Sequence, residues 1–149
     1  MSVRRGDVVL VDYPYSDRTG SKVRPAVVMQ ADALNPKITD TIIAAISSTS
    51  RGTATQFSIG ISTPDGKRTG LRSNCCVQCE NILTIDQKFI LGSIGKLSAS
   101  LVKQLDTCLK AALSLPWRPT QRRTPCFLHH RLTGHSPHRG PIGRQIVLP

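Results

Sequence analysis

Gly6-Asp-Val-Val-Leu-Val-Asp12 and Val23-Arg-Pro-Ala-Val-Val-Met-Gln30 are the two stretches that decide the fold of this chain. Each holds an apolar, β-branched run of strand length. The connection 13–22 is rich in Pro, Ser, Asp, Thr and Gly, which favour a loop, and it is too long for a tight hairpin. Arg24 stands directly before Pro25, and a residue before proline adopts an extended conformation. Because proline lacks a ladder donor, this pair predicts the start or the edge of a strand.

The segments that follow are mainly of strand type, and the last is a helix. The patterns predict a buried strand over 41–46, a half-exposed strand over 55–61, a turn-rich loop over 63–70, a strand over 71–79, a short turn from 84 and a final apolar strand at 89–91. Ser98 or Ser100 caps a helix that ends by Pro116. Its apolar positions, which lie on one face, are Leu101, Leu105, Leu109, Ala112 and Leu113. We therefore expect a mainly β fold with one C-terminal amphipathic helix, and one helix leaves the sheet to curl into a small, twisted barrel.

Composition divides the chain near residue 116. The 149 residues carry a net charge of +11, and residues 117–149 hold six Arg, all four His, five Pro and no acid. We expect 1–116 to be the folded domain, with a charge of +5, and 117–149 to be a disordered basic tail. The odd number of cysteines fits reduced thiols, and no apolar run approaches the roughly 18 residues of a membrane span. These features predict a cytoplasmic protein without membrane association.

Several kinds of chemical site are absent from the sequence. There is no Gly-rich phosphate loop, and residues 1–116 contain no His. Cys76 and Cys79 have the spacing of one of the two ligand pairs of a zinc site, but no second pair follows. Residues three apart on a strand also point to opposite faces of the sheet. We therefore predict no metal site and no cofactor.

Polar residues at the predicted strand ends form a chemically coherent set. Taken singly, Arg24 suits a surface ion pair, Ser47 a turn and Glu80 a strand-edge carboxylate. Together, an arginine, hydroxyls and a carboxylate suit cleavage of an RNA phosphodiester without a metal. RNA supplies its own nucleophile, the 2′-OH, so the protein needs to orient it, move two protons and stabilise phosphate charge. The residues expected to bind the RNA are Arg18, Lys22, Ser48, Arg51, Lys67, Arg68 and Gln78.

Four segments resemble the MazF/PemK/Kid toxins. They are residues 5–12 with Val23-Arg-Pro-Ala-Val-Val28, Ala44-Ala-Ile-Ser-Ser48, Val77-Gln-Cys-Glu-Asn-Ile-Leu-Thr-Ile-Asp86 and Ile94-Gly-Lys-Leu-Ser98 with the helix after it. The resemblance runs from about residue 3 to 115. It implies an SH3-like or CcdB-like barrel that forms a homodimer, cleaves single-stranded RNA at short sequences and is neutralised by an antitoxin encoded beside it.

The resemblance also implies roles for individual residues. Arg24 matches the principal catalytic arginine and is expected to stabilise the phosphate and act as general acid. Ser47 stands where many relatives have Thr and is expected to position the phosphate or the 2′-OH. Some relatives use an Arg-x-acid pair as acid and base; here Gln78 replaces that arginine, and Glu80 keeps the carboxylate as the expected base. The alternative class is a non-enzymatic toxin or binding module of the same fold, either a CcdB-like gyrase inhibitor or an inactive RNA- or protein-binding barrel.

Overall fold

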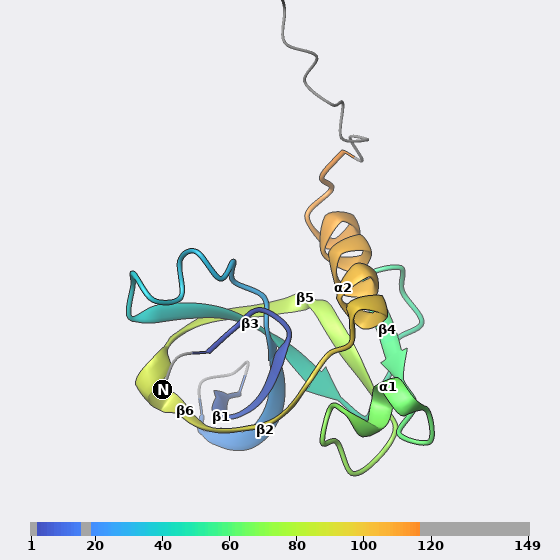
Figure 1. The fold of residues 1–149 in the computed structure, drawn as a ribbon, viewed down its shortest axis with the longest axis horizontal. Coiled ribbons are helices and arrows are strands. Elements are labelled where there is room, and N and C mark those ends of the chain that lie inside the picture. The colour runs from blue at the N-terminus through green and yellow to red at the C-terminus, as the bar shows by residue number, and fades with distance from the viewer. Residues whose placement is uncertain (1–2, 16–18, 117–149) are drawn as a thin grey trace, which may run out of the picture. The chain divides into compact units, whose positions relative to one another are not determined.

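The computed structural model describes residues 3–15 and 19–116. Within these ranges six strands form one antiparallel sheet in the order β4-β5-β3-β2-β1-β6, followed by one long helix (Figure 1). The elements are β1 (Asp7–Pro14), β2 (Ser21–Val28), β3 (Asp40–Ser47), β4 (Gln56–Ile59), α1 (Pro64–Lys67), β5 (Cys75–Asp86), η1 (Gln87–Phe89), β6 (Ile90–Lys96) and α2 (Ala99–Ala112). The predicted mainly β fold with one C-terminal amphipathic helix is confirmed.

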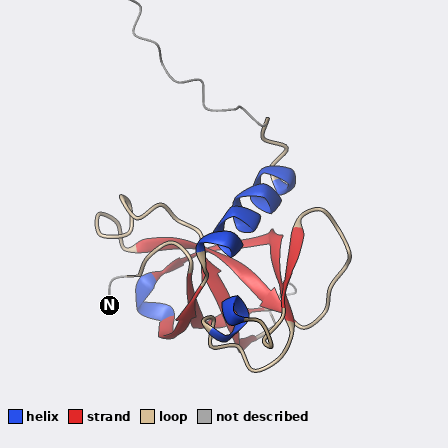
Figure 2. Ribbon diagram, turned by 45° about the vertical axis from the view of Figure 1, so that its right-hand side comes forward, coloured by secondary structure: helices blue, strands red, loops and turns tan. Residues whose placement is uncertain are grey.

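The sheet buries apolar side chains on both faces, and α2 lies against one of them (Figure 2). On that face Leu101 and Leu105 pack into a core with Val27 and Val77. On the opposite face the sheet curls over itself and encloses a second cluster. That cluster comprises Val3, Val9, Val11, Tyr13, Ala26, Val28, Ile43 and Ala45, with Leu83, Ile85 and Ile90 packed against it. The strands curl as expected, but the described sheet stays open, with β4 and β6 as its edges.

Local sequence explains where α2 begins. Ser98 is its N-cap, and the Ser98 hydroxyl accepts a hydrogen bond from the Leu101 amide at 3.4 Å. An ion pair between Arg5 and Asp106, at 2.5 Å, ties the helix to the N-terminal segment. No helix in the described part of the chain has the length and apolar character needed to cross a membrane.

Some predicted boundaries were wrong. The loop predicted over 63–70 contains α1, because Thr63 caps the Gly66 amide and Pro64 suits the first turn of a helix. The strand predicted over 71–79 starts at Cys75 and continues to Asp86, so no turn begins at 84. The final strand, Ile90–Lys96, is longer than predicted because it runs through two glycines. The connection after β1 is also shorter, since β1 reaches Pro14 and β2 starts at Ser21. The predicted tail, 117–149, lies outside the described residues, and the boundary at 116 stays a prediction.

Candidate active site

The candidate site lies where β2 and β3 separate. β2 pairs with β3 only from Ala26 to Val28, whereas it pairs with β1 as far back as Ser21. Arg24 and Pro25 are therefore inside β2 but at a stretch that has a neighbouring strand on one side only. This refines the prediction of a strand edge, since a proline without an N–H is tolerated where the second ladder is missing.

A polar pocket of about 390 Å³ occupies this separation and is called here the β2–β3 pocket. Its lining residues come from both strands and the loop after β3: Lys22, Val23, Arg24, Pro25, Ile46, Ser47, Ser48 and Thr49. Four predicted site residues, from segments about 20 residues apart, thus meet in one place. None of the eight lining residues is acidic, so the pocket carries a positive field that favours an anion.

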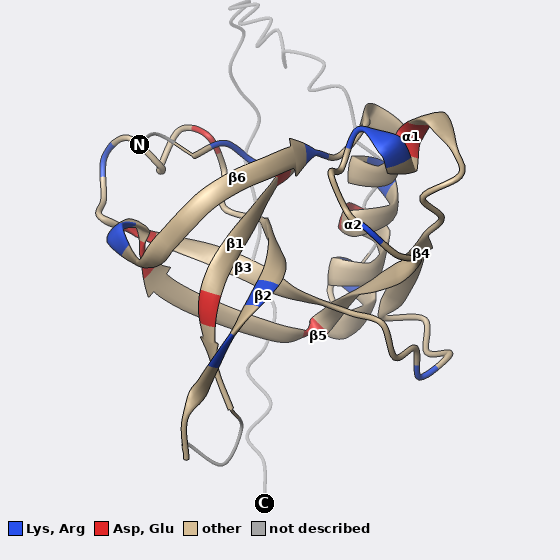
Figure 3. Ribbon diagram, turned by 90° about the horizontal axis from the view of Figure 1, so that it is seen from below, with Lys and Arg blue, Asp and Glu red and all other residues tan. Residues whose placement is uncertain are grey.

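The two basic residues of the pocket project from the same face of β2. Arg24 lies directly opposite Val11 in the register, and Lys22 lies opposite Tyr13. Figure 3 shows the basic stretches of β2 in blue. Arg24 is half-buried, and its guanidinium makes no hydrogen bond or ion pair with any described residue. Burial raises the pKa of Tyr13, and the nearby Arg24 charge opposes this rise. A planar donor that is positioned but unpaired is well suited to bind a phosphate.

Hydrogen bonds fix the loop that follows β3. The Ser47 hydroxyl accepts from the Thr49 amide at 3.1 Å, which leaves its O–H free to donate. The Thr49 carbonyl accepts from Gln78 Nε2 at 3.1 Å and from Cys76 Sγ at 3.1 Å. Gln78 is only 6% exposed. The structure therefore places the predicted RNA ligand Gln78 beneath the loop, where it holds Thr49.

Glu80 lies two residues further along β5 and does not line the β2–β3 pocket. Its carboxylate accepts hydrogen bonds from Thr55 Oγ1, at 2.8 Å, and from Gln56 Nε2, and it lies 3.7 Å from Arg51 Nη1. Burial raises the pKa of Glu80, but the hydrogen bonds and the Arg51 charge outweigh it and lower the pKa below its ordinary value. Gln56 Oε1 in turn accepts from the Arg51 amide at 2.9 Å. Glu80 thus holds the loop between β3 and β4.

The other predicted RNA-binding residues have different positions. Lys67 ends α1 and Arg68 follows it; both are exposed and neither lines the β2–β3 pocket. α1 is linked to α2, because Ser100 Oγ donates to Asp65 Oδ2 at 2.6 Å. Arg18 lies outside the described residues. Sequence reasoning gave no role to Thr49 or Gln56, whose roles depend on backbone and amide contacts that carry no sequence signature.

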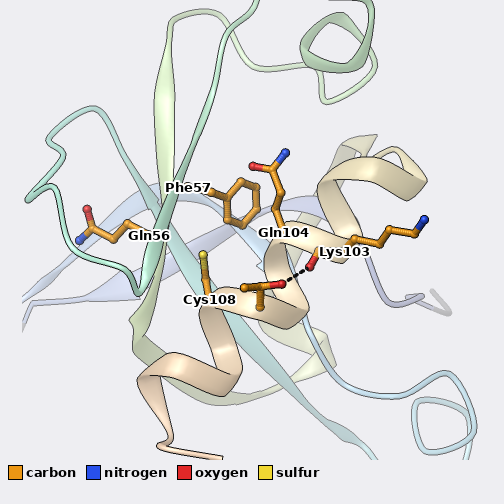
Figure 4. Close-up of a pocket in the computed structure, with 6 residues that line it drawn as sticks. Gln56, Phe57, Lys103, Gln104 and Cys108 are labelled. Atoms are coloured by element: carbon orange, nitrogen blue, oxygen red, sulfur yellow. Dashed lines mark hydrogen bonds between the residues drawn. The ribbon is translucent and has the colours of Figure 1, made fainter. Parts of the chain in front are cut away.

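A second hollow lies between β4 and α2 (Figure 4). It measures about 330 Å³ and is lined by Gln56 and Phe57 of β4 and by Lys103, Gln104, Thr107 and Cys108 of α2. The Thr107 hydroxyl donates to the Lys103 carbonyl at 3.0 Å, so it is engaged within the helix. This hollow shares no lining residue with the β2–β3 pocket.

The described residues contain no group of three or more His, Cys, Asp or Glu side chains arranged to hold a metal ion. Cys76 and Cys79 are both buried and free. Burial raises the pKa of Cys79 to about 12, with the neighbouring Cys108 adding to the rise. This thiol therefore stays protonated, as expected for a cysteine that packs in a core rather than one that ligates a metal.

The chain thus has an open, curled sheet, one covering helix and a basic pocket without acidic residues. These features suit a small protein that binds a phosphate chain. Residues 4–113 match the family described as PemK-like, MazF-like toxins of type II toxin-antitoxin systems, and the chain belongs to this family. It is 32% identical over 120 residues to endoribonuclease MazF9 of Mycobacterium tuberculosis, covering 76% of this chain and 98% of that relative.

Solved structures share the fold. An endoribonuclease in complex with its cognate antitoxin from a mycobacterial species superposes with a TM-score of 0.64 at 23% identity, covering 78% of this chain and 99% of that one. The Mycobacterium tuberculosis toxin MazF-mt6 gives a TM-score of 0.61 at 25% identity, covering 74% of this chain and 99% of that one. The expected resemblance to the MazF/PemK toxins is therefore confirmed.

Proposed function

We propose that this chain is a toxin endoribonuclease that cleaves single-stranded mRNA at short sequence motifs, without a metal or a cofactor. The observation that carries the proposal is the β2–β3 pocket, in which the unpaired Arg24 guanidinium and the Ser47 hydroxyl line one cavity with Lys22. A phosphodiester is the anionic group that such a donor set recognises. A gyrase-binding or inactive module has no need of these donors beside each other.

The chemistry needs one bond to form and one to break. The 2′-OH loses its proton and its oxygen bonds to phosphorus, while the bond from phosphorus to the 5′-oxygen breaks and that oxygen takes up a proton. Arg24 stabilises the charge on the phosphate oxygens and serves as general acid, and Ser47 donates its free O–H to the phosphate or orients the 2′-OH. Glu80 stays a candidate base, although its lowered pKa weakens it in that role.

The test is cleavage by Arg24→Ala. Loss of one preorganised donor typically costs about 10²–10³-fold in rate. Arg24→Lys should not restore the activity, since a point charge does not copy the planar fork. Arg4→Ala, which removes another exposed arginine, is the matched control and should stay active. The products should be a 2′,3′-cyclic phosphate and a 5′-OH, and a substrate with deoxyribose at the scissile position should resist. Full activity of Arg24→Ala, cutting of the deoxy substrate or loss of activity in chelator would refute the proposal.

The same proposal includes partners. The solved mycobacterial relative is bound to its cognate antitoxin, and we propose an acidic antitoxin whose disordered segment folds across the basic surface of this chain. We also propose that the chain is a homodimer, which light scattering at micromolar concentration tests. The site of action is the cytoplasm, where mRNA is found, and the free cysteines suit a reducing compartment.

A further inference from the structure

A second pocket adjoins the candidate active site on the other side of Pro25. It measures about 430 Å³ and is called here the Arg72 pocket. It is lined by residues of β1, β2, β6 and the start of β5, and by the loop before β5: Leu10, Pro25, Gly70, Leu71, Arg72, Ser73, Cys75 and Ile94. Leucine, isoleucine and proline side chains form a floor that is mainly apolar. None of these eight residues is acidic.

The loop before β5 is held against β6, which gives the pocket a defined wall. Gly70 has a φ of +70°, and a side chain there would collide with the Ile94 carbonyl. The Lys96 amide also donates to the Arg68 carbonyl at 2.9 Å. Only a glycine permits this close approach, so the position of the loop is built into the sequence.

Among the described residues that line this pocket, Arg72 is the one with a charge. It is exposed, and its guanidinium makes no hydrogen bond or ion pair with any described residue. The fold therefore does not need this arginine for its own contacts. Beside it, Cys75 Sγ is engaged with the Ser73 carbonyl at 3.2 Å, which tightens the turn into β5.

The Arg72 pocket adjoins the β2–β3 pocket. Pro25 lines both, with Arg24 on one side and Leu10 on the other. A small hollow of about 140 Å³ borders both, since Ser48 also lines the β2–β3 pocket and Cys75 also lines the Arg72 pocket. The Arg72 pocket is therefore a neighbouring place for a nucleotide next to a phosphate that binds at Arg24.

We propose that the Arg72 pocket binds one of the two nucleobases that flank the scissile phosphate and that Arg72 contributes to sequence specificity. The proposal rests on the endoribonuclease function above. A nucleobase has flat apolar faces and a hydrogen-bonding edge; the apolar floor suits the faces, and an arginine either hydrogen-bonds the edge or stacks on the ring. The described residues include few aromatic side chains, so an apolar pocket with an arginine is an alternative platform for a base.

The experiment measures cleavage of a preferred RNA and of matched RNAs that carry an abasic nucleotide at each position beside the scissile bond. Wild-type protein should lose about tenfold or more in rate at one of these positions. Arg72→Ala should cleave the intact RNA about tenfold more slowly and should lose little further rate from the abasic change at that same position. Arg4→Ala is the control and should keep the wild-type pattern.

A second variant, Ser73→Trp, fills the pocket from an exposed loop position and should abolish the same abasic effect. If both variants keep the full wild-type penalty at every abasic position, the inference is overturned. It is equally overturned if the variants lose antitoxin binding while RNA cleavage and its abasic pattern stay unchanged, since the pocket then serves the antitoxin. Absence of cleavage by the wild-type protein would instead refute the proposed function, so the two failures are distinguishable.

Discussion

Glu80 has two candidate roles, and replacing its carboxylate with an amide separates them. A general base must ionise, and its removal costs about 10²–10⁴-fold in rate. A residue that holds the loop between β3 and β4 needs only acceptor oxygens. Glu80→Gln keeps one such oxygen for Thr55 or Arg51, so its loss in rate should be at most about tenfold, the size of one neutral hydrogen bond.

Glu80→Ala removes the support entirely. Hydrogen bonds to a charged acceptor contribute about 1.5–3 kcal/mol each. The Glu80 side chain is 26% exposed, so water replaces part of them, and we expect a net loss of about 1–2 kcal/mol. For a domain of this size that lowers the Tm by about 4–10 °C. The Arg51 backbone loses its indirect support through Gln56, so the cleavage rate should fall further in Glu80→Ala than in Glu80→Gln.

Stability against pH provides an independent check. Because the folded-state pKa of Glu80 is below its ordinary value of 4.5, its contribution is complete above pH 4.5 and is lost as the pH falls through the folded pKa. The difference in Tm between the wild type and Glu80→Gln should therefore shrink in acid. The assays are single-turnover cleavage from pH 6 to 9 and thermal unfolding from neutral pH down to below pH 4.5. A 10²-fold or greater loss in Glu80→Gln with an unchanged Tm would refute the loop-holding role and establish the base.

Three further predictions concern the tail, the basic residues near α1 and the core. A chain that ends at residue 116 should fold and keep its RNA sequence preference, losing only salt-sensitive affinity; unfolding on truncation would show that the boundary is misplaced. Neutralising Lys67 and Arg68 together should weaken RNA binding equally for all sequences. The slope of log affinity against log salt concentration should become shallower by about 0.7 for each phosphate that the protein no longer neutralises. An altered cleavage motif would instead show that these residues read bases. Leu105→Ala, at a fully buried position facing the sheet, should cost about 2–5 kcal/mol in denaturant unfolding, and a cost near zero would mean that α2 does not pack as described.

The periodic parts of the fold were predictable from the sequence. β-branched runs indicated β1, β2 and β3, and the apolar spacing with Ser98 as cap indicated α2. The course of β5 was not predictable, because a bulge inserts residues between Gln78, which pairs with Ala45, and Ile82, which pairs with Ala44. A bulge breaks the period of two on which strand prediction depends. Glycines likewise concealed most of β6.

For the site, the sequence indicated which residue types are present but not which of them line the pocket and which hold the neighbouring loops. Arg24, Ser47 and Ser48 do meet in one pocket with Lys22, as strand ends that converge would suggest. Gln78 was assigned to RNA binding and Glu80 to catalysis, as polar residues near a strand end that match the Arg-x-acid pair of some relatives. Their described contacts are instead with Thr49 for Gln78. Those of Glu80 are with Thr55, Gln56 and Arg51. Their partners come from loops, whose course depends on tertiary contacts that one sequence does not reveal.

The arrangement of contacts separates stability from catalysis in this domain. The apolar clusters and the hydrogen bonds of Gln78 and Glu80 hold the strands and the loop that border the site. The Arg24 side chain makes no hydrogen bond or ion pair with a described residue. Pro25, which has no N–H to donate, lies where β2 no longer pairs with β3. The charge of Arg24, which is half-buried beside Lys22, gains no stabilising ion pair with a described residue, and like-charge repulsion makes it a small cost. Such a residue is expected where binding energy is reserved for a ligand, because a guanidinium already paired to a carboxylate would have to break that pair before it could bind phosphate. The lack of an ion pair between Arg24 and any described residue, alongside a well-paired Glu80, is therefore the strongest physical argument that the phosphate binds at the separation of β2 and β3.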